Sequence, residues 1–175
     1  MHQLWKVALF VVAAVLLAAC RPVAAPFAPA AAPEAAAAAE PAADGEIVVV
    51  DTLGRSVTFA APPQRIVIAG RGTYMVTGAM FAFPAAQTQM AAIEGGRFND
   101  PTIFLPLVDA TFADKTNLER NAGPEQIAPV NPDAIVLKTS AQELGASLYH
   151  LGVPVVYFDM ESVEQYFTDL RTMGA

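Results

Sequence analysis

Three cationic side chains each follow an apolar segment typical of a buried strand. Arg71 follows residues 65–70, Arg97 follows residues 90–93 and Lys138 follows residues 134–137. They stand out because the chain is acidic, with 10 Lys plus Arg, 17 Asp plus Glu and a formal net charge of -7. A guanidinium binds oxyanions through two parallel hydrogen bonds, whereas an ammonium acts as a point charge. These cations predict a site for an anionic ligand, such as a carboxylate- or catecholate-bearing metal chelate.

The residues beside these cations are mostly polar or glycine. In an open α/β sheet, ligands bind beyond the carboxyl ends of the strands, where loops turn into helices. We therefore expect ligand contacts from three loops, through Arg71, Gly72, Thr73, Tyr74, Arg97, Asn99, Lys138, Thr139 and Ser140. The Tyr74 phenol could stack on a ligand or coordinate iron, but the residue equally suits a core position. Thr73 and Ser140 also suit the role of helix caps.

Strand and helix patterns alternate along residues 45–175. Short β-branched or apolar runs predict strands at 46–51, 56–59, 65–70, 90–93, 134–137 and 153–158, of which the first two form a hairpin. Helical spacing or capping signals predict helices at 75–83, 100–108, 123–128, 140–151 and 162–175. This alternation indicates an α/β fold, with a mainly parallel sheet flanked by helices and preceded by a short β-hairpin.

The sequence offers little for catalysis. It has no histidine pair, no cysteine pair and no glycine-rich phosphate loop, and Ser140 and Ser147 lack the nucleophile elbow. His150 stands near a predicted helix end, where a surface role is the simpler interpretation. We expect a protein that is not an enzyme and that carries no resident cofactor or metal. The acidic balance also argues against generic attraction to nucleic acid.

The only cysteine, Cys20, ends an apolar run that begins after Lys6. A short positive start, an uncharged stretch and small residues before the break form a secretory signal. Leu17-Ala18-Ala19-Cys20 resembles the lipobox of bacterial lipoproteins, in which the cysteine is lipidated and becomes the first residue of the mature chain. The resemblance implies a signal peptide at 1–19 and a lipid anchor on Cys20. The alternatives are an ordinary signal peptide and an uncleaved anchor helix.

Residues 20–44 consist mostly of alanine and proline. They present no periodic apolar face, and the prolines interrupt long helices. We interpret this segment as a tether between the anchor and a domain at 45–175, with a helical stalk as the alternative. The protein would then be exported and held by lipid, on the outer face of the cytoplasmic membrane or in the periplasm.

The order of elements after residue 45 resembles a known family. The hairpin with Asp51, Gly54 and Arg55 is followed by residues 65–68, by Pro124-Glu125-Gln126-Ile127 leading to residues 131–136, and by residues 151–155. This order is similar to the amino-terminal lobe of the periplasmic substrate-binding proteins of ABC importers for iron-siderophores, haem and cobalamin. The resemblance implies two Rossmann-like lobes bridged by one helix, with the ligand in the cleft between them.

The resemblance also implies partners. An ABC permease and its ATPase would receive the small-molecule ligand, and the binding protein would act as a monomer. In the family an acidic surface residue meets the permease, and Glu143 lies near that position, although a solvated helix charge is the simpler interpretation. The second lobe is not within residues 45–175, which suggests a fragment. The alternatives are a single-domain lipoprotein acting as an adhesion or scaffold module, and a metal-cluster enzyme with similar lobes, which would need cysteine ligands.

Overall fold

A computed structural model describes residues 45–95 and 101–175. It begins with the predicted antiparallel hairpin, formed by strands β1 (Ile47–Val50) and β2 (Ser56–Phe59), in which Val49 lies opposite Val57. The turn between them docks on the neighbouring strand β7 (Val155–Phe158). The Thr52 amide donates to the Tyr157 carbonyl at 3.1 Å, and the Arg55 guanidinium donates to the Val155 carbonyl at 2.8 Å.

The main sheet has five parallel strands in the order β5-β4-β3-β6-β7. The strands besides β7 are β3 (Ile66–Ala69), β4 (Met90–Glu94), β5 (Thr116–Leu118) and β6 (Ala134–Lys138). The predicted mainly parallel sheet is therefore confirmed. The edge strand β5 was not predicted, because a run of three residues without an apolar pattern gives no strand signal.

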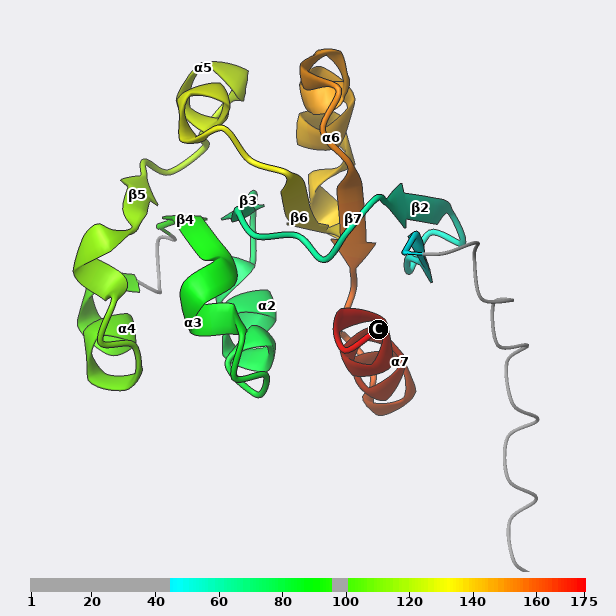
Figure 1. Cartoon of the computed structure of the whole chain (residues 1–175), viewed down its shortest axis with the longest axis horizontal. Coiled ribbons are helices and arrows are strands. Elements are labelled where there is room, and N and C mark those ends of the chain that lie inside the picture. The colour runs from blue at the N-terminus through cyan, green and yellow to red at the C-terminus, as the bar shows by residue number, and fades with distance from the viewer. Residues whose placement is uncertain (1–44, 96–100) are drawn as a thin grey trace, which may run out of the picture. The chain divides into compact units, whose positions relative to one another are not determined.

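Helices cover both faces of this sheet (Figure 1). The α-helices are α2 (Thr73–Met80), α3 (Ala86–Gln89), α4 (Pro101–Val108), α5 (Pro124–Ile127), α6 (Gln142–Leu148) and α7 (Val163–Met173). Short 3-10 helices span Phe112–Asp114, Ala128–Val130, Thr139–Ala141 and Tyr149–Leu151. Figure 1 shows α5 and α6 on one face of the sheet and α2, α3, α4 and α7 on the other.

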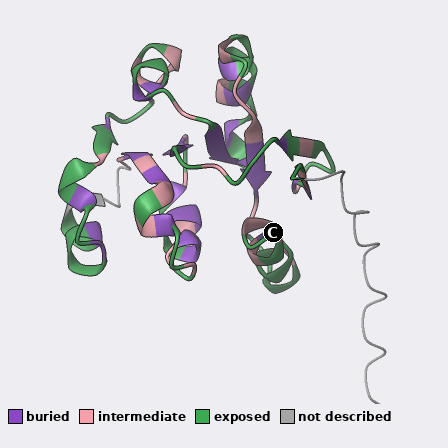
Figure 2. Cartoon of the chain, viewed as in Figure 1, coloured by how far each residue is buried: buried purple, intermediate pink, exposed green. Residues whose placement is uncertain are grey.

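Side chains alternate between these two faces along each strand. Ile68 and Val136 belong to the core beneath α2 and α7, whereas Val67 and Ile135 belong to the core beneath α5 and α6. Because successive residues of a strand point to opposite faces, a strand covered on both sides must be apolar throughout. Figure 2 shows the result, with buried residues concentrated in the sheet and on the inner sides of the helices.

Helix boundaries agree with the sequence in part. Ser162, the first residue of the helix predicted at 162–175, caps α7, since its hydroxyl accepts from the Gln165 amide at 3.1 Å. The prediction that Ser140 caps a helix is wrong: the strand leads first into a 3-10 turn, and α6 begins at Gln142 after Ala141. Asp100, the first residue of the helix predicted at 100–108, lies outside the described residues.

The amino-terminal predictions also lie outside the described residues. These are the signal at 1–19, the lipidation of Cys20 and the tether at 20–44. Within residues 45–95 and 101–175, no helix combines the length and the apolar character needed to cross a membrane.

Candidate functional site

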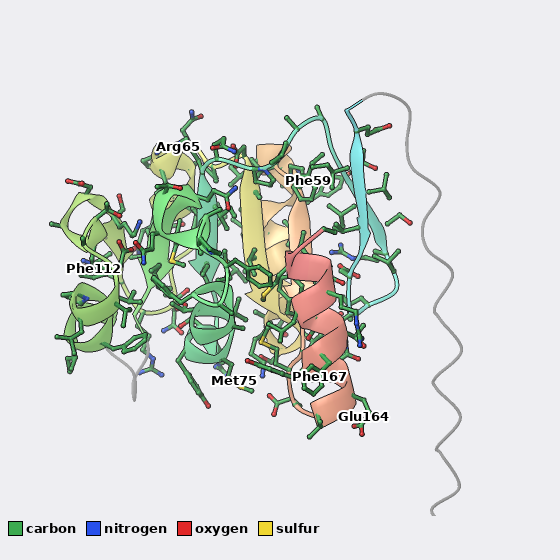
Figure 3. All side chains as sticks on the ribbon, turned by 60° about the horizontal axis from the view of Figure 1, so that its bottom comes forward. Phe59, Arg65, Met75, Phe112, Glu164 and Phe167 are labelled. Atoms are coloured by element: carbon green, nitrogen blue, oxygen red, sulfur yellow. The ribbon has the colours of Figure 1, made fainter. Side chains whose placement is uncertain are left out.

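The strand order places a crevice between β3 and β6. From β3 the chain proceeds outward through β4 to β5, and it then returns to the other side of β3 to form β6 and β7. The loops that follow β3 and β6 therefore leave in opposite directions, which is the arrangement at which open α/β sheets bind ligands. Figure 3 shows Arg65, just before β3, at one end of the sheet and Met75 of α2 towards the other.

A pocket of about 530 Å³ occupies this carboxyl edge. It is lined by Gly70, Arg71, Glu94, Asn121, Ala122, Gly123, Thr139, Ser140, Ala141, Gln142, Glu143 and Leu144. Its size is typical of small-molecule sites. The lining brings together three of the predicted ligand contacts, Arg71, Thr139 and Ser140, and it also includes Glu143.

Two glycines shape the loop that carries Arg71. Gly70 has φ +83° and Gly72 has φ +76°, in the left-handed region that favours glycine. A Cβ on Gly70 would lie 2.7 Å from the Ala141 Cβ, which is too close for two carbon atoms. The loop after β3 can therefore close against the start of α6, and the exposed Arg71 side chain lies on the pocket wall.

Lys138 lies on the other face of the sheet and is absent from the described pocket lining. Its side chain is buried, its ammonium forms an ion pair with Glu161, and its Nζ lies 3.4 Å from the Met75 sulfur. A Cβ on Gly72 would lie 2.7 Å from the Lys138 Cδ, so this glycine leaves room for the lysine stem. Lys138 thus carries a charge that the protein already neutralises.

The other predicted contacts have varied surroundings. Thr73 is buried and donates through its hydroxyl to the Glu94 carbonyl at 3.1 Å, while Gly72 takes the N-cap position of α2. Tyr74 is 54% exposed, which argues against the alternative of a core position. The Thr139 hydroxyl donates to the Asp159 carboxylate. Arg97 and Asn99 lie outside the described residues.

The sequence did not identify Glu94 as a site residue. This side chain ends β4 and is only 3% exposed, yet it lines the pocket. Its Oε2 accepts from the Gly70 amide at 2.6 Å, and its Oε1 accepts from the Asn121 amide at 2.8 Å. Burial raises the pKa of Glu94, and these amides offset part of that shift. The signal in the sequence that could have identified Glu94 is its position as a charged residue at the end of an otherwise apolar strand.

A second cavity is apolar. It encloses about 350 Å³ over the α2 and α7 face of the sheet and includes Phe59, Ile66, Met80 and Phe158 in its lining. Within residues 45–95 and 101–175, no group of three or more His, Cys, Asp or Glu residues could hold a metal ion. The pocket at the carboxyl edge, with its polar and charged lining, is therefore the candidate binding site.

Comparison with known proteins agrees with this topology. No protein-family model matches the chain, and no curated protein does so. Among solved structures, a periplasmic solute-binding protein from Veillonella parvula matches with a TM-score of 0.55 and 20% identity, covering 74% of this chain and 40% of that one. The shared feature is the fold.

Two further solved structures share this fold. The catecholate-siderophore binding protein VctP of Vibrio cholerae matches with a TM-score of 0.55 and 20% identity, covering 74% of this chain and 44% of that one. CeuE of Helicobacter pylori, in a complex described as Ni-His, matches with a TM-score of 0.57 and 15% identity, covering 74% and 41%. The matched part of the chain thus covers about two fifths of the length of these three proteins.

Proposed function

We propose that this chain is the amino-terminal lobe of a substrate-binding lipoprotein that captures a metal chelate for an ABC importer. The ligand class is an iron-siderophore or a related complex such as haem or cobalamin. The observation that carries the proposal is the pocket at the switch between β3 and β6, where Arg71 lies on the wall. The protein would bind and deliver its ligand without chemical turnover, and the metal would be part of the cargo.

Several features support the other parts of this proposal. The solute-binding proteins of the same fold are more than twice as long as the matched region, so we propose that a second lobe completes the cleft. The lipobox at Cys20 and the Ala/Pro-rich tether suit a receptor held near its permease. Glu143 is exposed at the start of α6 and is our proposed contact for a basic residue of the permease.

Equilibrium dialysis of the full-length protein, including the proposed second lobe, tests the binding function. The probes are the iron(III) complexes of a trihydroxamate and of a tricatecholate, together with haem and cobalamin. We expect saturable retention of at least one probe, with one molecule bound per chain. If the chain retains none of the four, the metal-chelate function is wrong, and the scaffold or adhesion alternative becomes the better account.

A further inference from the structure

At the carboxyl edge of the sheet, a carboxylate of the protein already accepts hydrogen bonds from backbone amides that an anionic ligand could otherwise use. In an α/β site, an oxyanion usually accepts hydrogen bonds from amides of the loops that follow the strands. Here the Glu94 carboxylate accepts from the Gly70 amide after β3 and from the Asn121 amide after β5, at 2.6 and 2.8 Å. Both of these residues line the pocket. A ligand oxyanion at this position would have to displace a buried carboxylate.

The described residues that line the pocket are also not cationic overall, and Arg120, which acts on the Glu94 charge, is not among them. Among its described lining residues, Arg71 carries a positive charge, and Glu94 and Glu143 carry negative charges. Lys138, which the sequence placed in the cationic set, is paired with Glu161 on the other face of the sheet. Because charges interact more strongly at a partly buried site than in bulk water, the Glu94 carboxylate disfavours further negative charge nearby.

We infer that the pocket selects metal chelates of low net charge and excludes strongly anionic ones. This inference rests on the proposed function and narrows its substrate class. Iron(III) held by three hydroxamates is neutral, whereas iron(III) held by three catecholates is trianionic. A neutral chelate can place one polarised oxygen against Arg71 without bringing excess charge to Glu94. The favoured class is therefore the hydroxamate type, in contrast to the anionic ligands that the sequence alone suggested.

Glu94 has a positioning effect as well as a charge. It links the loop that carries Arg71 to the loop that carries Asn121, since its two oxygens accept one amide from each. Glutamine at position 94 would keep the size of the side chain and one acceptor while removing the charge. Glu94→Gln therefore removes the charge and one of the two hydrogen bonds to the loops. Comparing the two probes separates these effects, because the lost hydrogen bond acts on both probes and the charge acts mainly on the trianionic one.

The experiment is equilibrium dialysis of the same full-length protein with two hexadentate probes at low and high salt. One is the neutral iron(III) complex of N-acetylated desferrioxamine B, and the other is the trianionic iron(III) complex of a tricatecholate. We expect the neutral probe to bind about tenfold or more tightly than the trianionic one at low salt. The preference should persist at high salt, because salt screens a buried carboxylate only weakly.

Glu94→Gln should raise the ratio of the affinity for the trianionic probe to that for the neutral probe about tenfold. The matched control is Glu164→Gln, which removes an exposed carboxylate on α7, away from the described pocket lining. It should change neither affinity. Tighter or equal binding of the trianionic probe by the unmodified chain overturns the charge inference but leaves the proposed function standing. If the protein retains neither probe, nor haem, nor cobalamin, both the charge inference and the proposed function are wrong.

Discussion

Replacing Gly145 with alanine is expected to lower the free energy of unfolding by about 3 kcal/mol. Gly145 is buried in α6, and the helix lies against the sheet through this residue. An added Cβ would overlap the Tyr157 hydroxyl, lie 2.8 Å from the Tyr157 Cζ and lie 3.2 Å from a Leu137 methyl. Since Leu137 and Tyr157 lie in the paired strands β6 and β7, α6 itself would have to move. Urea denaturation followed by circular dichroism measures the loss.

Gly78→Ala is the matched control for this substitution. Gly78 lies in the interior of α2, where a new Cβ would meet no described heavy atom within 4 Å. Alanine there should stabilise the protein by about 0.5–1 kcal/mol, because it is the better helix former. Adding Tyr157→Phe to Gly145→Ala should recover part of the lost stability by removing the overlapping hydroxyl. Equal stability of the two glycine variants would contradict the packing of α6 described above.

Asp169→Ala should destabilise the protein by about 3 kcal/mol, because it leaves buried donors without an acceptor. Asp169 is 1% exposed. Its Oδ2 accepts from the Asp159 and Met160 amides at 2.9 and 3.0 Å, and its Oδ1 accepts from the Thr52 hydroxyl at 2.7 Å. The carboxylate thus links α7 to the loop after β7 and to the hairpin turn. Thermal unfolding measures the effect.

The loop held by Asp169 contains an unusual backbone conformation. Met160 has φ +60°, which is costly for a residue with a side chain. The Asp169 carboxylate stabilises this conformation, and Glu161, the partner of Lys138, follows directly. Glu164→Ala on the same helix is the control: this exposed residue (Figure 3) should change stability by less than about 0.5 kcal/mol. An Asp169→Ala variant as stable as this control would show that the buried network contributes little.

Much of the fold could be predicted because burial on two faces leaves a clear pattern. Residues 66–69 and 134–137 are continuous apolar runs, and the structure confirms both as central parallel strands. The hairpin was predictable from its β-branched runs and turn residues. The edge strand β5 was missed because Thr116 and Asn117 are exposed and give no apolar signal.

The candidate site was less predictable, because it depends on pairings between distant residues. The rule that ligands bind at the loops after strands pointed to Arg71, Thr139 and Ser140, and the structure places these three residues around one pocket. Lys138 follows the same rule in sequence, but its pairing with Glu161 depends on how the loop after β7 folds. Glu94 was missed for a related reason, since its partners Gly70 and Asn121 are 24 and 27 residues away. Sequence spacing alone contains no information on such pairs.

The measurement that tests the central claim most directly is the affinity of Arg71→Ala for the tightest-binding probe of the dialysis series. Among the described residues that line the pocket, Arg71 is the one with a cationic side chain. Its loss should therefore weaken binding about tenfold or more. Arg171→Ala, which removes an exposed guanidinium near the end of α7, should leave the affinity unchanged. Equal affinities of Arg71→Ala and the unmodified chain would contradict the assignment of the ligand to this pocket.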